Sequence, residues 1–245
     1  MTLVLAVDDS GGPGSEAQAQ PEIFASLQGE GPSAGRPCAF VRLSRCNLAC
    51  AWCDTAYTWR FTGPDAFDRR AEQVVLSEAE TAERIRALGR DRLVVTGGEP
   101  LLQAPALSRM LALLPGVRVE IETNGTVAPP PALDALVDQY NVSPKLAHSG
   151  NRMDLALIPE RLAAFAADPR AYFKFVVADP ADLGEVAALQ QRYAIPDERL
   201  FVMPEGTDSA TLRSRLAWLE KACAKRGWRL SDRLHIHLYG DTRGT

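Results

Sequence analysis

Three cysteines stand close together in Cys46-Asn-Leu-Ala-Cys50-Ala-Trp-Cys53, with the spacing C-x3-C-x2-C. Thiolates so near in sequence can converge on one small inorganic group, and three of them suit a cubane iron–sulfur cluster whose fourth iron has no protein ligand. A cluster that only relays electrons is normally closed by a fourth thiolate, whereas an open metal position is typical of catalytic sites. The motif therefore predicts a cluster that takes part directly in chemistry.

A zinc site is the alternative use of these cysteines, with Cys38 or a distant histidine as the fourth ligand. Zinc ribbons usually carry a second C-x2-C pair, but the other cysteines here are Cys38 and Cys223, which stand alone. We interpret both as buried small hydrophobic residues. Five cysteines in 245 residues are few and odd in number, so the sequence indicates a reducing cytoplasm and not a disulfide framework.

The elements that must position the cysteines follow a repeated strand–helix alternation. Ser77 and Glu80 form a capping box that starts the first long helix. The pattern predicts strands over 39–43, 93–95, 117–121, 140–142, 172–177, 200–203 and 234–239. It predicts helices over 77–88, 104–114, 131–138, 159–166, 181–191 and 209–226. Such alternation implies a parallel sheet with right-handed crossovers.

Polar or glycine-containing groups follow nearly every predicted strand, which is typical of the active face of a barrel. A closed eight-fold barrel needs about 250 residues. Here residues 1–20 and an irregular, aromatic-rich insertion over 56–76 contribute little to one. We therefore predict an α/β fold, an open partial (β/α) barrel with a parallel sheet, helices outside and the active site at the C-terminal strand ends. Residues 1–20 are interpreted as a flexible N-terminal extension and 21–245 as a single domain.

Composition narrows the function classes. The chain is 46% hydrophobic and 24% charged, with a net charge of −4 and a pI near 5.5, which argues against a nucleic-acid partner. No apolar stretch is long enough to span a membrane, and residues 3–7 lack the basic flank of a signal peptide. We expect a cytoplasmic protein with a small-molecule substrate.

Several polar residues have two interpretations each. Arg42 stands in an apolar strand, where it either completes a salt bridge or binds a ligand carboxylate bidentately. Gln28 and Glu30 stand among glycines that either let the backbone approach a ligand or simply form a turn. Lys174, in another apolar strand, is interpreted as paired with an acidic residue inside the barrel.

Two histidines near the C-terminus, His235 and His237, share one strand face if 234–239 is a strand. Such a pair can hold zinc or serve packing. We favour His235 in the pocket.

The cysteine motif, with the aromatic Trp52 before its last cysteine, resembles the signature of radical S-adenosylmethionine enzymes, in which the cofactor's methionyl amine and carboxylate chelate the open iron. The stretch Thr96-Gly-Gly-Glu-Pro100 resembles the superfamily motif that holds the methionyl amine. Its two glycines permit close backbone approach, and Glu99 or a carbonyl can accept from an ammonium.

Four further stretches, in this order and spacing, resemble the 7-carboxy-7-deazaguanine synthases. They are Leu27-Gln-Gly-Glu-Gly31, Cys53-Asp-Thr55, Ser143-Pro-Lys145 and Gly240-Asp-Thr-Arg-Gly244. The match runs from about residue 21 to the C-terminus. Activases of glycyl radical enzymes share the cysteines, but their loop more often continues with histidine after the last one.

The resemblance implies a set of site residues. Cys46, Cys50 and Cys53 would bind a 4Fe-4S cluster and Thr55 would bind Mg²⁺. S-adenosylmethionine would be bound by Trp52, Cys53, Asp54, Gly98, Glu99, Ser143, Pro144, Lys145, Met203, Pro204, Glu205 and Gly206. The substrate would be bound by Leu27, Gln28, Gly29, Glu30, Arg42, Thr96, His235 and the terminal Thr245. No catalytic residue is implied beyond the cluster and the cofactor.

The resemblance also implies a reaction. The reduced cluster would split S-adenosylmethionine, and the resulting radical would take hydrogen from C6 of 6-carboxy-5,6,7,8-tetrahydropterin. Ring contraction and loss of ammonia would give 7-carboxy-7-deazaguanine, a precursor of queuosine and other 7-deazapurines. A homodimer and an electron donor such as flavodoxin are implied as well. The alternatives are a glycyl radical enzyme activase and a non-catalytic zinc-binding module.

Overall fold

The strands of the described residues join into one sheet. The structure is a computed structural model and describes residues 2–8 and 19–245. Its eleven described strands are β1 (Thr2–Asp8), β2 (Gln20–Pro21), β3 (Ile23–Leu27), β4 (Pro37–Leu43), β5 (Gln73–Ser77), β6 (Arg92–Gly97), β7 (Arg118–Thr123), β8 (Gln139–Val142), β9 (Ala171–Val177), β10 (Leu200–Pro204) and β11 (Arg229–Leu230). Their order is β11-β10-β9-β8-β7-β6-β4-β1-β2, with β3 beside β4 and β5 beside β1.

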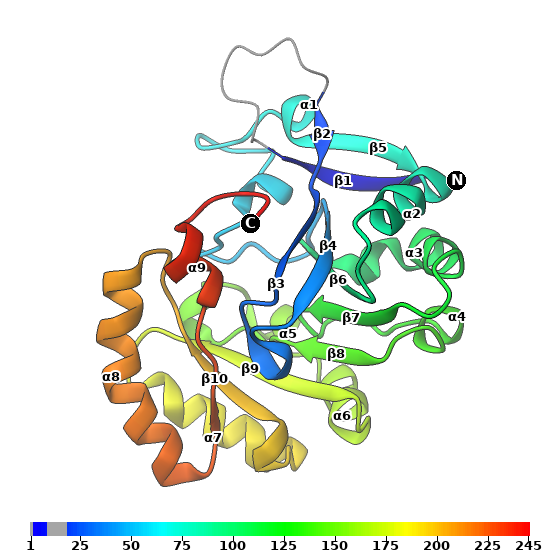
Figure 1. Ribbon diagram of the computed structural model, residues 1–245. Coiled ribbons are helices and arrows are strands. Elements are labelled where there is room, and N and C mark those ends of the chain that lie inside the picture. The colour runs from blue at the N-terminus through cyan, green and yellow to red at the C-terminus, as the bar shows by residue number, and fades with distance from the viewer. Residues whose placement is uncertain (1, 9–18) are drawn as a thin grey trace.

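Seven of these strands, β4 and β6 to β11, run parallel to one another, whereas β1 and β3 pair antiparallel with β4. The helices are α1 (Arg69–Glu72), α2 (Glu78–Ala87), α3 (Ala104–Leu111), α4 (Pro131–Asp134), α5 (Met153–Ala156), α6 (Pro159–Ala167), α7 (Asp182–Tyr193), α8 (Ser209–Arg226) and α9 (Leu234–Tyr239). The longer helices lie around the outside of the sheet (Figure 1). The predicted α/β partial barrel is confirmed, and the carboxyl ends of its parallel strands meet at one edge.

Local patterns predict most of the helices well. Ser77 caps α2 by accepting a hydrogen bond from the backbone N–H of Glu80, as the capping box indicates. The bounds of α8 agree with the predicted 209–226, because Asp208 caps its start and Gly227 adopts a left-handed conformation at its end. Helices α3 and α4 end several residues earlier than expected.

The prediction of a flexible extension over 1–20 is wrong for residues 2–8. They form β1, which pairs with β4, β2 and all of β5, and the side chains of Leu3 and Leu5 are completely buried. The short apolar run at the start of the chain is thus part of the core. Residues 1 and 9–18 of the predicted extension lie outside the described residues.

The insertion over 56–76 is also more regular than predicted. Its last part is β5, which pairs antiparallel with β1, and it contains the short helix α1. The strand β5 was missed because its pairing partner β1 lies in the segment that was interpreted as an extension.

The predicted strand over 234–239 is wrong, because these residues form helix α9. The backbone N–H of Leu234 bonds to the carbonyl of Gly29, which starts the helix against the β3 loop. Consecutive helical residues turn by about 100°, so His235 and His237 do not share a face.

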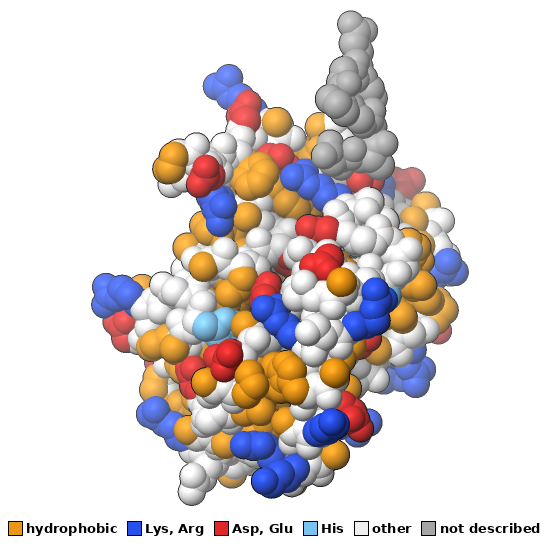
Figure 2. Space-filling model, turned by 90° about the vertical axis from the view of Figure 1, so that its left-hand side faces the viewer, with side chains coloured by type: hydrophobic (Ala, Val, Ile, Leu, Met, Phe, Trp, Pro, Cys, Tyr) orange, Lys and Arg blue, Asp and Glu red, His pale blue; other side chains and the backbone are white. Residues whose placement is uncertain are grey.

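The distribution of basic side chains and the character of the helices are relevant to nucleic-acid and membrane partners. On the face drawn in Figure 2, the Lys and Arg side chains of the described residues are scattered among acidic and polar ones and form no continuous patch. Among the described residues, no helix has both the length and the apolar character that crossing a membrane requires.

Candidate active site

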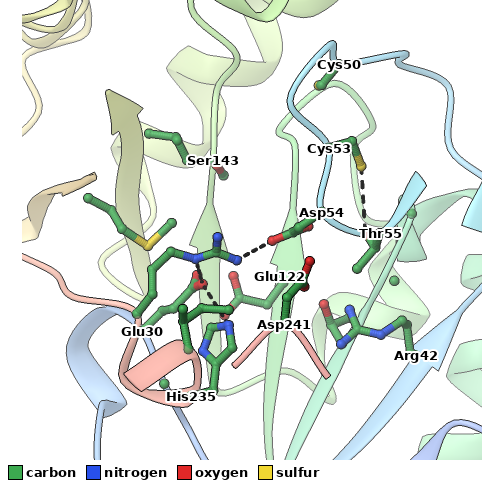
Figure 3. Close-up of a pocket in the computed structure, with 18 of the residues that line it drawn as sticks. Glu30, Arg42, Cys50, Cys53, Asp54, Thr55, Glu122, Ser143, His235 and Asp241 are labelled. Carbon is green, nitrogen blue, oxygen red and sulfur yellow. Dashed lines mark hydrogen bonds and ion pairs between the residues drawn. The ribbon is translucent and has the colours of Figure 1, made fainter. Parts of the chain in front are cut away.

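A cavity of about 250 Å³ opens at the carboxyl ends of the parallel strands. The cluster cysteines line one side of it, as Figure 3 shows for Cys50 and Cys53, and Glu30 and His235 lie at the other. Arg42 approaches from β4. The fold thus brings residues from both ends of the chain around one space.

The cluster loop is held against the end of β6 by the backbone. The N–H groups of Gly98 and Glu99 donate to the carbonyls of Leu43 and Arg45, at 3.0 and 2.8 Å. Gly97 has φ +137°, and a Cβ there would lie 1.9 Å from the Leu43 carbonyl oxygen. Glycine is therefore required where the Thr96-Gly-Gly stretch passes the loop.

The three cysteines fit an iron–sulfur cluster. All three line the cavity, and none of the described cysteines forms a disulfide. Each sulfur accepts a hydrogen bond from a side-chain N–H outside the loop, supplied by Asn124, Asn151 and Trp59. Such donors are characteristic of protein-bound clusters. Among the described residues, no three His, Cys, Asp or Glu side chains are arranged to hold a single metal ion.

The carboxylate of Glu99 is not where the sequence places it. Glu99 is completely buried and does not line the cavity. It accepts hydrogen bonds from the backbone N–H groups of Leu101 and Asn124 and from the hydroxyl of Thr123. Burial raises its pKa to about 7 despite these bonds. Gly97 and Gly98 do line the cavity, so their backbone and not the Glu99 side chain faces a ligand.

Most of the residues predicted to bind S-adenosylmethionine line the cavity. The cavity is lined by Trp52, Cys53, Asp54, Ser143, Lys145, Met203, Glu205 and Gly206, whereas Pro144 and Pro204 do not reach it. The Trp52 ring stacks on His148 at 5.5 Å between centroids, and the Lys145 ammonium lies 5.4 Å from its centre. The Trp52 indole N–H is buried and has no partner in the described residues.

The predicted substrate residues also come together. Leu27, Gln28, Gly29, Glu30, Arg42, Thr96, His235 and Thr245 all line the cavity, as does Thr55. The Thr55 hydroxyl lies 3.7 Å from the Cys53 sulfur.

Arg42 forms the salt bridge that is one of its two interpretations, and it also lines the cavity. Its Nε donates to Glu22 Oε1 at 2.7 Å, and Tyr57 donates to Glu22 Oε2 at 2.8 Å. The salt bridge orients the guanidinium, which still points into the cavity (Figure 3).

A buried charge network forms the floor of the cavity. Lys174 Nζ lies 2.5 Å from Glu30 Oε2 and 2.9 Å from Glu122 Oε2, so Lys174 is paired as predicted. Burial opposes ionisation of Glu30, but Lys174 and Arg233 hold its pKa well below the ordinary value. Burial raises the pKa of Glu122, with Lys174 acting against it and Glu30 adding to it.

Arg233 is a cavity residue that the sequence did not reveal. Its guanidinium donates to Glu30 at 3.1 Å, to the Gly206 carbonyl at 2.5 Å and to Asp54. It follows β11 in a loop with no recognisable motif, so only the fold shows its position. Glu122 was easier to find from the sequence, because it directly follows the predicted strand over 117–121.

Helix α9 sends its two histidines in different directions. His235 lines the cavity, and burial holds its pKa below the ordinary value. His237 instead contacts Ser209 at 2.8 Å and Asp232 at 3.2 Å. The pair is therefore no zinc site.

Known proteins resemble this chain in sequence and in structure. Residues 41–149 match the Radical SAM superfamily. A 7-carboxy-7-deazaguanine synthase of Pyrobaculum aerophilum is 39% identical over 225 residues, which cover 91% of this chain and 95% of that protein. The chain belongs to the 7-carboxy-7-deazaguanine synthase family.

Other members of the family are also similar to this chain. The synthase of Halobacterium salinarum is 37% identical over 253 residues, covering 91% of each chain. The crystal structure of QueE from Escherichia coli superposes with a TM-score of 0.63 at 25% identity and covers 95% of both chains. These relatives support a radical enzyme of the synthase family over a glycyl radical enzyme activase and over a zinc-binding module.

Proposed function

We propose that this chain converts 6-carboxy-5,6,7,8-tetrahydropterin to 7-carboxy-7-deazaguanine. The observation that carries the proposal is one cavity with three cysteine thiols on one side and Arg42 and Glu30 on the other, in a chain of the synthase family. Ring contraction with loss of ammonia then supplies a precursor for queuosine and other 7-deazapurines.

The 4Fe-4S cluster and S-adenosylmethionine, when bound, supply the one-electron chemistry that removes hydrogen from the substrate. The chain's own residues bind and orient the reactants and exclude water. Backbone carbonyls around Gly97 and Gly98 would accept hydrogen bonds from the methionyl amine. Trp52, Lys145 and Met203 form the wall against the rest of the cofactor.

The substrate is oriented by opposite charges. Arg42 binds its carboxylate, because a planar guanidinium matches two carboxylate oxygens and Glu22 already fixes its direction. Glu30, kept ionised by Lys174 and Arg233, accepts from the amine and amide edge of the pterin. Thr96, Gln28 and His235 complete the contacts, and the terminal residue Thr245 also lines the cavity.

Thr55 would hold magnesium, together with the substrate carboxylate and water. Mg²⁺ usually keeps several waters and needs few protein ligands, so one threonine oxygen beside the substrate is sufficient. There the ion would orient the carboxylate and stabilise charge as a Lewis acid.

The oligomeric state, the electron donor and the cellular location are proposed separately. A homodimer is proposed from the resemblance, and α9 exposes Leu238 and Tyr239, which a second copy could cover. A flavodoxin-like protein is proposed as the electron donor. The free cysteines support a cytoplasmic setting.

Anaerobic reconstitution tests the proposal. The protein should turn brown and bind about four iron atoms per chain. Incubation with S-adenosylmethionine, dithionite, Mg²⁺ and the carboxytetrahydropterin should then yield 7-carboxy-7-deazaguanine, identified by mass and ultraviolet spectrum. A brown protein that leaves the pterin unchanged would contradict the substrate, and a colourless protein that binds zinc would contradict the reaction class.

A further inference from the structure

Each cluster cysteine accepts one side-chain N–H from a different part of the fold. The pairs are Asn124 with Cys46 at 3.8 Å, Asn151 with Cys50 at 3.2 Å and Trp59 with Cys53 at 3.2 Å. Asn124 follows β7, Asn151 lies just after a short 3-10 helix over Ala147–Ser149, and Trp59 follows another over Ala56–Thr58. The loop itself supplies the backbone N–H of Leu48 to the Cys46 sulfur at 3.5 Å, and the Thr55 hydroxyl lies 3.7 Å from the Cys53 sulfur. The side-chain N–H donors, by contrast, all come from the surrounding fold.

Trp59 differs from the two asparagines. The Asn124 amide nitrogen also donates to Asn47 at 3.0 Å, and that of Asn151 also donates to Ser149 at 3.1 Å. An indole has only one N–H, and that of Trp59 is directed at Cys53. Both asparagines therefore hold loop segments as well, whereas the Trp59 hydrogen goes to sulfur alone.

The position of Trp59 is fixed by its surroundings. Its backbone N–H donates to the carbonyl of Ala56, and the preceding Thr58 is completely buried. The Thr58 carbonyl accepts from the backbone N–H of Arg45, just before the first cysteine. The residue before Trp59 is thereby bonded to the residue before Cys46.

A hydrogen bond to a cluster sulfur stabilises negative charge. Reduction of the bound cluster adds one electron from an external reductant, and no proton needs to move. The reduced state carries more negative charge, so an N–H donor stabilises it more than the oxidised state and raises the reduction potential. The effect is enhanced where the site is partly shielded from water.

We propose that the indole N–H of Trp59 raises the reduction potential of the cluster through its hydrogen bond to Cys53, making Trp59 a positioning and tuning residue of the radical chemistry. The inference rests on the proposed function only in taking the three thiolates as cluster ligands. It gives a role to one aromatic residue of the insertion over 56–76.

The test compares two tryptophan variants of the full chain. Trp59→Phe keeps an aromatic ring and removes the N–H. Trp228→Phe is the matched control, because the buried Trp228 donates its indole N–H to Gln190 at 2.8 Å and not to sulfur. Both are reconstituted anaerobically, their iron is quantified, and the cluster is titrated against potential by EPR without S-adenosylmethionine.

Trp59→Phe should bind as much iron as the wild type, but its potential should be more negative. At a fixed solution potential the ratio of reduced to oxidised cluster should fall about three- to tenfold, where tenfold corresponds to 59 mV for one electron. Trp228→Phe should titrate like the wild type.

An unchanged potential in Trp59→Phe with full iron would overturn the inference. Loss of iron from that variant would overturn it too, because the indole would then retain the cluster instead of tuning it. An equal shift in Trp228→Phe would assign the effect to general loosening. If the wild type itself binds no cluster, the proposed function fails, which is a different outcome from all of these.

Discussion

Lys174 and Glu30 lie 144 positions apart in the sequence, yet their charged atoms are 2.5 Å apart at the floor of the cavity. The same ammonium contacts Glu122 at 2.9 Å. One cation thus keeps two buried carboxylates together where a polar substrate must bind.

Replacing Lys174 by methionine should destabilise the fold and weaken substrate binding. Two buried carboxylates would lose their shared counterion, which typically costs about 3 to 5 kcal/mol of unfolding free energy. Urea denaturation measures the loss. The exposed Lys225 of α8 provides the control, since Lys225→Met should change stability by less than about 0.5 kcal/mol. A Lys174→Met variant as stable as this control would show that the pair contributes nothing.

The raised pKa of Glu99 should make the unfolding free energy depend on pH. Its pKa is about 7 in the folded protein and 4.5 when unperturbed, so between these values the folded state holds a proton that the unfolded state has released. Stability from this group is therefore present below pH 4.5 and is lost as pH rises to about 7, by about 3 kcal/mol in total.

Glu99→Gln removes this titration while keeping an acceptor for Thr123. The unfolding free energy of the variant minus that of the wild type should increase from pH 5 to pH 7 and then level off. Urea denaturation at several pH values tests it in the protein without added iron. A difference that stays constant with pH would mean that Glu99 is already ionised at pH 5.

Gly29 predicts a steric effect on the substrate end of the cavity. A Cβ at this position would lie 2.2 Å from Nδ1 of His235, so Gly29→Ala must displace the imidazole. We expect KM for the pterin to rise about tenfold, equivalent to about 1.4 kcal/mol of binding, with a smaller change in kcat. Gly184→Ala in α7 is the control, because a Cβ there meets nothing within 4 Å. Equal KM values for the two variants would place His235 outside the substrate contacts.

The variant Thr55→Ala should affect the response to magnesium without affecting the cluster. The variant should bind iron and keep the brown colour, because Thr55 contributes no ligand to the cluster. Its activity should respond more weakly to added Mg²⁺, with half-saturation shifted at least severalfold upward. Titration of initial rate against Mg²⁺ measures this. An identical response in variant and wild type would remove Thr55 from the metal site.

The sequence predicted what local chemistry determines. The cysteine spacing, the glycines of Thr96-Gly-Gly, the capping box at Ser77 and the strand–helix alternation each depend on residues that are close in sequence, and all have counterparts in the structure. The parallel sheet in turn predicted that the carboxyl ends of the strands lie at one edge, around the site.

The sequence could not predict contacts between distant segments. Arg233 joins Glu30 and Asp54 across about 200 and 179 residues, and no motif marks it. The apolar run over 234–239 is compatible with a strand or a helix. It forms helix α9 in the structure, where the backbone N–H of Leu234 bonds to the carbonyl of Gly29. The same holds for β1 and β5, each of which is recognisable only from the other.

The ratio of product to cofactor tests the central claim most directly. The reconstituted wild type is supplied with limiting S-adenosylmethionine, dithionite, Mg²⁺ and excess carboxytetrahydropterin, with Cys50→Ala, which cannot complete the cluster, as the blank. We predict several molecules of 7-carboxy-7-deazaguanine per S-adenosylmethionine present, and none with Cys50→Ala. Cleavage of S-adenosylmethionine to 5′-deoxyadenosine without conversion of the pterin, or equal product from Cys50→Ala, would contradict the account.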